Sequence, residues 1–391
     1  MDKNALLKAA DINFANANYQ QALDKLRQYC QLMPNDIEQW FRLATSEEQV
    51  GSKQACQEAY QHCIEIGSNS ARLYLFAGMF FLNQQQQQKG LALLSLGCDL
   101  DQTMLYWFQD ENLDDQIRGR SYYAGLALRN HFTELSKIKL ADKSQNSGKC
   151  NGALWPQTHN EPWQYKTDNQ KPHLFYLPEL TAQAFWPNQD FSWTDKFREQ
   201  FDELKQEFDA VADDIEVQGA PYVDANFADK SFDKLAGSKN WTALHLYQNG
   251  IKNEALVERL PKLHKLLMSI DLYGLNEHPY EVFFSLLKAG QHIVPHYGLS
   301  NHSLTVHIPF IVGNSGALTV NHIAKPWQCG ESLIFDDSFE HEAINSSEQD
   351  RIVLIFSIWH PELSKQERQA IQQSFQARQN WLDSREQLAK A

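Results

Sequence analysis

Residues 285–310 read SLLKAGQHIVPHYGLSNHSLTVHIPF and hold two runs of strand-forming residues around a turn-rich centre. The runs SLL and SLTVHIPF are rich in Leu, Val, Ile and Thr, whereas Gly290, Gly298 and Asn301 lie between them. Aliphatic and β-branched residues favour strands, and Gly and Asn mark the turns that join them. The stretch therefore predicts strands connected by short turns.

Similar runs flank this stretch on both sides. They are PYEVFFSLLKAG (279–290), GALTVNH (316–322), GESLIFDD (330–337) and DRIVLIFSIWH (350–360). Many short strands at nearly regular spacing, with no helix between them, indicate a sandwich or barrel. Residues 191–216 before this region have apolar residues at helical spacing, and residues 361–391 after it form a polar amphipathic pattern that begins with a proline. We expect one helix in each of these two flanks.

The first third of the chain repeats itself. The segment from Ile37 aligns with the segment from Ala71 at an offset of 34 residues, so that Trp40 matches Tyr74, and a partial earlier copy contains Ala22 at the small-residue position. This pattern resembles the tetratricopeptide repeat (TPR), in which small residues lie where paired helices cross. An ordinary helical bundle is the alternative. A stack of such pairs would offer a concave surface for a peptide.

These patterns predict an α+β multidomain chain. We expect a TPR-like helical repeat domain at residues 1–136, a polar linker at 137–172, a double-stranded β-helix (jelly-roll, cupin-like) domain at 173–365, and a C-terminal helix at 366–391.

Composition excludes several classes of partner. The 391 residues are 42% hydrophobic, which suffices for buried cores, and the formal charge of −14 disfavours nucleic acid and anionic membrane surfaces. No run has the length or apolarity of a signal peptide or membrane span. The six cysteines include no CxxC pair, so we interpret them as buried free thiols. We expect a cytoplasmic protein.

Three histidines are candidate site residues. His296 follows a strand-like HIVP, His307 lies within LTVHIPF, and His341 lies within FDDSFEHE, so all three can project from neighbouring strands. Imidazoles in such an arrangement suit Fe(II), Zn(II) or Cu(II). Each histidine taken alone can equally be a core or surface residue. A zinc hydrolase with His292, His296 and His307 as ligands is a weaker alternative, because Pro295 opposes the helix that would align the first two.

Arg351 begins the apolar run RIVLIFSIW. A guanidinium in a buried strand needs an anionic partner, because an unpaired buried charge costs several kcal/mol. A dicarboxylate cosubstrate would provide one, and Ser285 could donate its hydroxyl to the same carboxylate.

Residues 285–310, followed by GESLIFDDSFEHE and RIVLIFSIWHPEL, resemble the aspartyl/asparaginyl β-hydroxylase family of Fe(II)/2-oxoglutarate-dependent dioxygenases. The resemblance covers about Trp241 to Leu363, and a TPR-like N-terminal region also occurs in that family. It implies hydroxylation of an unactivated C–H by dioxygen, at the β-carbon of Asp or Asn in a peptide or protein. A non-catalytic peptide-binding adaptor, or an oxygenase for a small molecule or lipid, is the alternative.

The resemblance also implies roles for individual residues. His296 and His341 would be the iron ligands, and Ser285, Thr305, His307 and Arg351 would form the 2-oxoglutarate site. At the Thr305 position members of the family often have arginine.

Many such oxygenases carry an acid two residues after the first histidine, whereas this chain has Gly298, as the resembling family does. The resemblance thus implies a two-histidine iron with water in the place of the carboxylate, and we expect Gly298→Asp to keep or tighten metal binding. The acids Asp336, Asp337, Glu340 and Glu342 near His341 are interpreted as groups that orient the imidazole or shape the loop.

Overall fold

The computed structural model describes residues 2–135, 137, 148–160, 162–225, 230–275 and 277–391. The chain divides into two compact units. Unit 1 contains residues 1–135 and 377–391, and unit 2 contains residues 136–376. Part of the segment interpreted as a linker, residues 138–147 and 161, lies outside the described residues.

Unit 1 is helical and repeats at the predicted period. Its paired helices are α1 (Lys3–Ala15) with α2 (Tyr19–Leu32), α3 (Ile37–Val50) with α4 (Lys53–Ile66), and α5 (Ala71–Asn83) with α6 (Gln87–Leu100). The first helices begin at residues 3, 37 and 71 and the second at 19, 53 and 87, so both series advance by 34 residues. Helix α7 (Asp115–Leu135) and the end of α13 (Lys365–Lys390) complete the unit.

Small residues explain how each pair packs. Ala10 and Ala22, which are fully buried, are followed at the same period by Ala44 with Cys56 and by Gly78 with Gly90. A Cβ added to Gly90 would lie 2.8 Å from the carbonyl oxygen of Gly78, so the backbones of α5 and α6 touch there. The prediction of helix pairs that cross at small residues is confirmed.

Unit 2 contains two antiparallel sheets. The eight-stranded sheet has the order β1-β10-β7-β12-β5-β3-β2 with β4 paired to β3, and the four-stranded sheet has the order β6-β11-β8-β9. The strands of the larger sheet are β1 (Phe185–Trp186), β2 (Ala220–Pro221), β3 (Trp241–Gln248), β4 (Ile251–Lys252), β5 (Glu281–Leu287), β7 (Ser303–Ile311), β10 (Leu333–Phe335) and β12 (Arg351–Trp359). Those of the smaller sheet are β6 (His292–His296), β8 (Ala317–Val320), β9 (Ile323–Lys325) and β11 (His341–Ile344). All five runs predicted as strands are strands, and the unit is the expected jelly roll.

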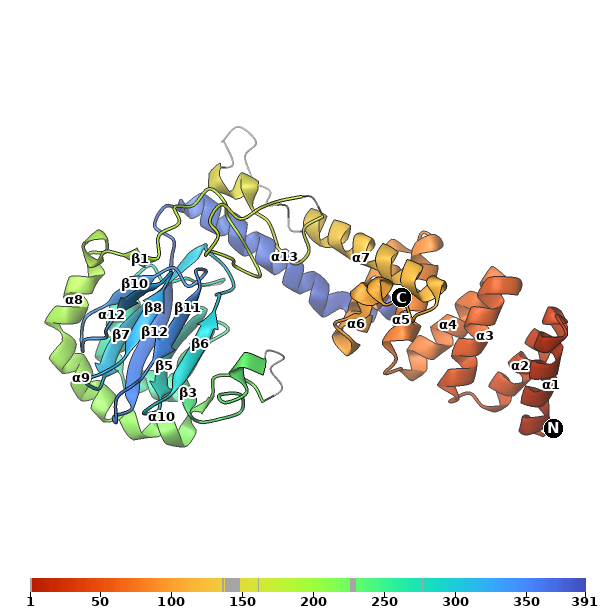
Figure 1. Cartoon of the computed structure of the whole chain (residues 1–391), viewed down its shortest axis with the longest axis horizontal. Helices are drawn as coiled ribbons and strands as arrows, with labels where there is room; N and C mark the ends of the chain where they lie inside the picture. The colour runs from red at the N-terminus through yellow and green to blue at the C-terminus, as the bar shows by residue number, and fades with distance from the viewer. Residues whose placement is uncertain (1, 136, 138–147, 161, 226–229, 276) are drawn as a thin grey trace. The chain divides into compact units, whose positions relative to one another are not determined.

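Helices cover the outer face of the larger sheet (Figure 1). They are α8 (Trp193–Glu199), α9 (Phe201–Asp209), α10 (Ala212–Gln218), α11 (Glu254–Glu258) and α12 (Pro261–Leu267). Phe208 of α9 packs on Phe284 of β5, with ring centroids 5.2 Å apart, inside the core that this face buries. The single helix predicted over residues 191–216 is wrong in extent, because the segment forms the three short helices α8, α9 and α10.

The alternate side chains of the same strands face the smaller sheet. Leu287, Val353 and Phe335 of the larger sheet form one core with Ile293 and Ala343 of the smaller sheet. Since successive strand residues point to opposite faces, Ser285 and Arg351 face this interior together with Leu287 and Val353. None of the described helices is long and apolar enough to span a membrane.

His302 lies in an aromatic cage of unit 2. Its ring is 4.8 Å from Tyr273 and 5.4 Å from Phe375, between centroids, and within the described chain neither ring nitrogen has a hydrogen-bond partner. Burial lowers the pKa of His302 to about 3, and the nearby charge of His360 acts in the same direction.

This histidine should make unit 2 sensitive to acid. The unfolded chain takes up the proton below pH about 6.5, whereas the folded chain resists it down to about 3, so stability falls as the pH falls through this window. We expect His302→Phe to reduce the acid-induced decrease in the free energy of unfolding by up to about 1.4 kcal/mol per pH unit. Urea unfolding between pH 7 and pH 4.5 measures it, with the exposed His278→Phe as control. Parallel curves for His302→Phe and the parent would contradict the prediction.

Candidate active site

Two histidines meet where β6 and β11 pair. His296 and His341 are direct partners in the register, and their ring centroids are 4.1 Å apart. The Nδ1 of His296 is 2.8 Å from the Val294 carbonyl oxygen, and that of His341 is 3.0 Å from the Phe339 carbonyl oxygen. A carbonyl only accepts, so each Nδ1 carries the hydrogen and each Nε2 carries the lone pair. Burial lowers the pKa of His341, which favours the neutral form that binds metals.

A carboxylate lies beside this pair, but it comes from another part of the chain. Asp337 accepts a hydrogen bond from the Thr305 hydroxyl at 3.0 Å, and its backbone carbonyl accepts one from the Gly298 amide at 2.7 Å. Burial raises the pKa of Asp337 to about 6, while Thr305 and the charge of His296 oppose the rise. Asp337 therefore lies next to Gly298, the position at which many such oxygenases carry an acid.

The side chain of Asp337 leaves no room at residue 298. A Cβ added to Gly298 would lie 2.5 Å from Asp337 Oδ1 and 2.8 Å from the Asp337 carbonyl oxygen. The expectation that Gly298→Asp keeps or tightens metal binding is therefore corrected. We expect this variant to lose about 1–3 kcal/mol of stability, the usual cost of overpacking, and to bind less iron.

Thermal unfolding and the iron content after anaerobic loading test this prediction. Gly119→Asp is the matched control, because a Cβ on Gly119 meets no atom within 4 Å. Tighter iron binding by Gly298→Asp at unchanged stability would show that Asp337 moves aside at little cost.

Arg351 lies in the interior with most of its hydrogen-bonding capacity unused. The residue is 1% exposed, and its Nη2 donates to the Ser285 hydroxyl at 3.3 Å. Within the described chain, its Nε and Nη1 have no hydrogen-bond partner. Its guanidinium carbon lies 4.7 Å from the centroid of the Trp327 ring. Burial lowers the pKa of Arg351 to about 9, so the side chain is still a cation at neutral pH and needs an anion.

His307 lies between the arginine and the histidine pair. Trp327 Nε1 donates to His307 Nδ1 at 3.3 Å, so the remaining ring hydrogen is on Nε2. Burial lowers the pKa of His307 well below its usual value, and the charges of Arg351 and His341 lower it further. His307 is therefore a neutral donor, and its neighbours on β10 and β12 in the register are Leu333 and Ile355.

Four aromatic rings line β3 and β5 beside Ser285. Tyr222 stacks on Trp241 at 4.4 Å and on Phe283 at 5.2 Å, and Phe283 stacks on His245 at 5.0 Å. Trp241 Nε1 also donates to Ser285 Oγ at 3.1 Å. This wall was not predictable from the sequence, because its members come from three separate segments and meet only through the strand register.

The side chains of the site suit a metal ion and a carboxylate. The lone pairs on Nε2 of His296 and His341 suit a divalent metal, and the guanidinium beside Ser285, whose Nε and Nη1 are unused within the described chain, suits a carboxylate. Among the described residues, no three His, Cys, Asp or Glu side chains are arranged as a metal-binding group. His292 of the zinc hydrolase alternative is instead 2.7 Å from Glu342, between Nε2 and Oε2.

Asp336, another acid near His341, makes hydrogen bonds within the loop that precedes the histidine. Asp336 is buried and accepts hydrogen bonds from Ser338 and from Gln170, the latter at 2.7 Å. These contacts hold the segment that leads from β10 to His341.

A jelly roll that joins a histidine pair to a buried arginine, with two guanidinium nitrogens unused within the described chain, has the side chains of a metal-dependent enzyme that uses a carboxylate cosubstrate. Residues 198–361 match the model of the aspartyl/asparaginyl beta-hydroxylase family. This segment is therefore similar to that family, as the motifs indicate.

Curated relatives agree with the family match. The chain is 24% identical over 351 residues to the human aspartyl/asparaginyl beta-hydroxylase, a match that covers 88% of this chain and 41% of the human protein. It is 25% identical over 209 residues to aspartate beta-hydroxylase domain-containing protein 2 of Xenopus tropicalis, covering 53% of this chain and 55% of that protein. It is 30% identical over 130 residues to the ornithine lipid ester-linked acyl 2-hydroxylase of Rhizobium tropici, a match that covers 32% of this chain and 44% of that protein. The chain thus spans little more than half, or less, of the relatives it matches.

Proposed function

We propose that the protein is an Fe(II)/2-oxoglutarate-dependent dioxygenase that hydroxylates an unactivated C–H bond. The family match of residues 198–361 supports the class of reaction. The observation that carries the proposal within the site is the buried guanidinium of Arg351, whose Nε and Nη1 have no partner in the described chain. A buried cation without an anion destabilises the fold, so its presence indicates that an anion binds there.

In this proposal each polar side chain has one task. His296 and His341 hold the iron through Nε2, and the backbone carbonyls on their Nδ1 atoms fix the ring orientation. Arg351 and Ser285 bind the carboxylate of 2-oxoglutarate that is remote from the metal. His307 donates its Nε2 hydrogen to the same cosubstrate.

The bound iron and cosubstrate supply the oxidising chemistry, with dioxygen as oxidant and succinate and carbon dioxide as by-products. The protein contributes position and a dry interior. Asp337, held by Thr305, keeps a negative charge next to the histidine pair.

For the substrate we propose the β-carbon of Asp or Asn in a peptide or protein. The names of the human and Xenopus relatives support this choice. The helix pairs of unit 1 give a second reason, because stacked pairs offer an extended surface to a polypeptide. We also propose a cytoplasmic location, which the six free cysteines support.

A lipid acyl chain is the second candidate substrate. The relative from Rhizobium tropici is named as an acyl hydroxylase of an ornithine lipid, and its identity of 30% exceeds that of the other relatives described above. The aromatic wall of Tyr222, Trp241 and Phe283 would suit an apolar group as well as a peptide side chain.

One experiment separates these candidates from each other and from a non-catalytic adaptor. The iron-loaded protein is incubated with 2-oxoglutarate and cell extract, and mass spectrometry searches peptides and lipids for the gain of one oxygen atom, with His341→Ala as control. Oxygen on Asp or Asn peptides supports the first candidate, and oxygen on lipids supports the second. Iron loading without succinate formation on any substrate would favour the adaptor.

A further inference from the structure

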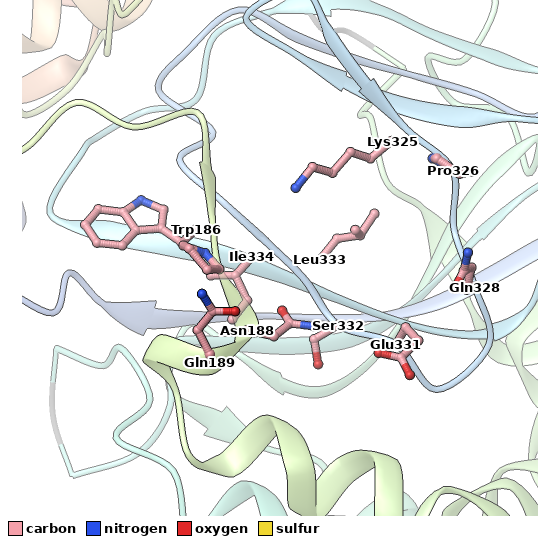
Figure 2. A pocket seen from close by; sticks show the side chains of 11 residues that line it. Trp186, Asn188, Gln189, Lys325, Pro326, Gln328, Glu331, Ser332, Leu333 and Ile334 are labelled. Carbon is pink, nitrogen blue, oxygen red and sulfur yellow. The ribbon is translucent and has the colours of Figure 1, made fainter.

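Trp327 lies on the loop between β9 and β10, with its indole in the interior of unit 2. Figure 2 shows its chain neighbours Pro326 and Gln328, which line a cavity of about 410 Å³, whereas Trp327 is not among the lining residues. The residue is 7% exposed, and a Cβ added to Gly316 would lie 3.5 Å from its Cζ3. Close packing therefore fixes the position of the indole.

The indole contacts two residues of the candidate active site at once. Its Nε1 donates a hydrogen bond to His307 Nδ1 at 3.3 Å, and its face lies against Arg351, whose guanidinium carbon is 4.7 Å from the ring centroid. The planes of the indole and the imidazole differ by 18°, and their centroids are 6.5 Å apart. This arrangement is edge to edge, so the indole hydrogen points at the in-plane lone pair of His307 Nδ1.

The hydrogen bond determines which hydrogen His307 can donate. A neutral imidazole carries its hydrogen on either nitrogen, and a neighbour that donates to one nitrogen places the hydrogen on the other. Trp327 occupies Nδ1, so the hydrogen is on Nε2. The Phe335 ring packs edge-on against the imidazole, with centroids 5.0 Å apart and planes at 88°, and restrains its rotation. His307 is thus held as a donor before any ligand binds.

The face of the indole holds Arg351. This arginine is 1% exposed, and its Nε and Nη1 have no hydrogen-bond partner in the described chain. An aromatic face attracts a cation without occupying its N–H groups, and the attraction is stronger where water is excluded. Trp327 therefore keeps the guanidinium in place and leaves two of its nitrogens for an anion.

We propose that Trp327 is a positioning residue of the cosubstrate site, which holds His307 and Arg351 ready to bind 2-oxoglutarate. The inference rests on the proposed function, because that function supplies the anion. The edge of the indole sets the tautomer of His307, and its face holds the guanidinium of Arg351. Such preorganisation lowers the cost of ordering these side chains when the ligand binds.

Nitrogen NMR of the metal-free full chain tests the tautomer directly. Long-range spectra distinguish a ring nitrogen that carries a hydrogen from one that carries a lone pair, and the signals that vanish in His307→Ala assign His307 among the 14 histidines. We expect the hydrogen on Nε2 in the parent. In Trp327→Phe, which keeps an aromatic ring but removes the N–H, both tautomers should be populated. Trp193→Phe is the control, because Trp193 packs on Phe356 at the other face of the sheet.

Calorimetric titration of the Mn(II)-loaded protein with 2-oxoglutarate tests the effect on binding. Loss of one neutral hydrogen bond should raise the dissociation constant about fivefold in Trp327→Phe, because the remaining ring still faces Arg351. The control Trp193→Phe should leave it unchanged. In the His307→Ala background, Trp327→Phe should change the dissociation constant by less than about twofold, since no imidazole remains to be positioned.

Three results would overturn the proposal. They are a hydrogen on Nδ1 of His307 in the parent, an unchanged tautomer in Trp327→Phe, and an equal weakening of binding with and without the imidazole, which is the result for a purely structural residue. The first needs no Trp327 variant, so the proposal can fail even if Trp327→Phe does not fold. A parent protein that does not bind 2-oxoglutarate would reject the proposed function, whereas the tautomer spectra would still support or reject the control of His307 by Trp327.

Discussion

Replacing Arg351 with methionine is expected to weaken 2-oxoglutarate binding strongly while making the cosubstrate-free protein more stable. A charge-assisted hydrogen bond to a carboxylate contributes roughly 1.5–3 kcal/mol, so its loss should raise the half-saturating concentration about 10–150-fold. The same guanidinium has two unpartnered donors in an interior where the residue is 1% exposed. Removing them should recover about 1–3 kcal/mol of the desolvation cost.

The two opposite signs make this prediction specific to a binding role. Succinate formation against cosubstrate concentration measures the first effect, and thermal unfolding without cosubstrate measures the second. Arg259→Met is the control, because Arg259 is partly exposed and pairs with Asp214. Thr305→Ala should have a smaller effect on binding, about fivefold or less, because the Thr305 hydroxyl donates to Asp337 at 3.0 Å and one such hydrogen bond contributes about 1 kcal/mol. Equal effects of the two substitutions, or a less stable Arg351→Met protein, would show that Arg351 is a structural residue.

Replacing His341 with alanine is expected to abolish iron binding. Two histidines provide the protein ligands in the proposed centre, so the loss of one removes half of them. We expect the affinity to fall by more than the roughly 10–100-fold that loss of an outer hydrogen-bond partner costs. Because Ala343 and Ile344 keep their pairing with β6 and β8, β11 should still form.

Iron content after anaerobic loading, with circular dichroism to confirm folding, measures this effect. His292→Ala is the matched control, because His292 lies on the same strand as His296 but is 2.7 Å from Glu342. A folded His341→Ala protein that binds iron as well as His292→Ala does would reject the histidine pair as the metal site.

Most helices and strands could be predicted from the sequence, because their formation depends on residues close together in the chain. The helix pairs follow from apolar spacing and from small residues such as Ala44 and Gly78 at one period, and the strands follow from runs such as 350–360. The break of residues 191–216 into three helices was not predictable from spacing, because apolar residues keep a helical spacing through the whole segment. The positions of Ser285, His307 and Arg351 followed from motif resemblance, and their shared interior face follows from strand alternation.

The parts of the site that depend on register could not be predicted. Asp337 was one of several acids near His341, and only the contacts with Gly298 and Thr305 distinguish it from Glu342. The stacking of Tyr222 on Trp241 and Phe283 joins segments far apart in sequence. A single sequence does not show which residues pair across strands. A one-residue shift of the register would move these side chains to the other face of the sheet and change the site.

Helix α13 determines when unit 1 can finish folding during synthesis. Its residues from 377 onward belong to unit 1, where Trp381 packs on Phe132 with ring centroids 5.3 Å apart and donates to Gln88 at 3.1 Å. Unit 1 is therefore discontinuous, and during synthesis its first 135 residues must wait for a segment that follows all of unit 2. Until that segment leaves the ribosome, the surface that will receive Trp381 lacks this cover, and exposed apolar surface makes an incomplete chain prone to aggregation.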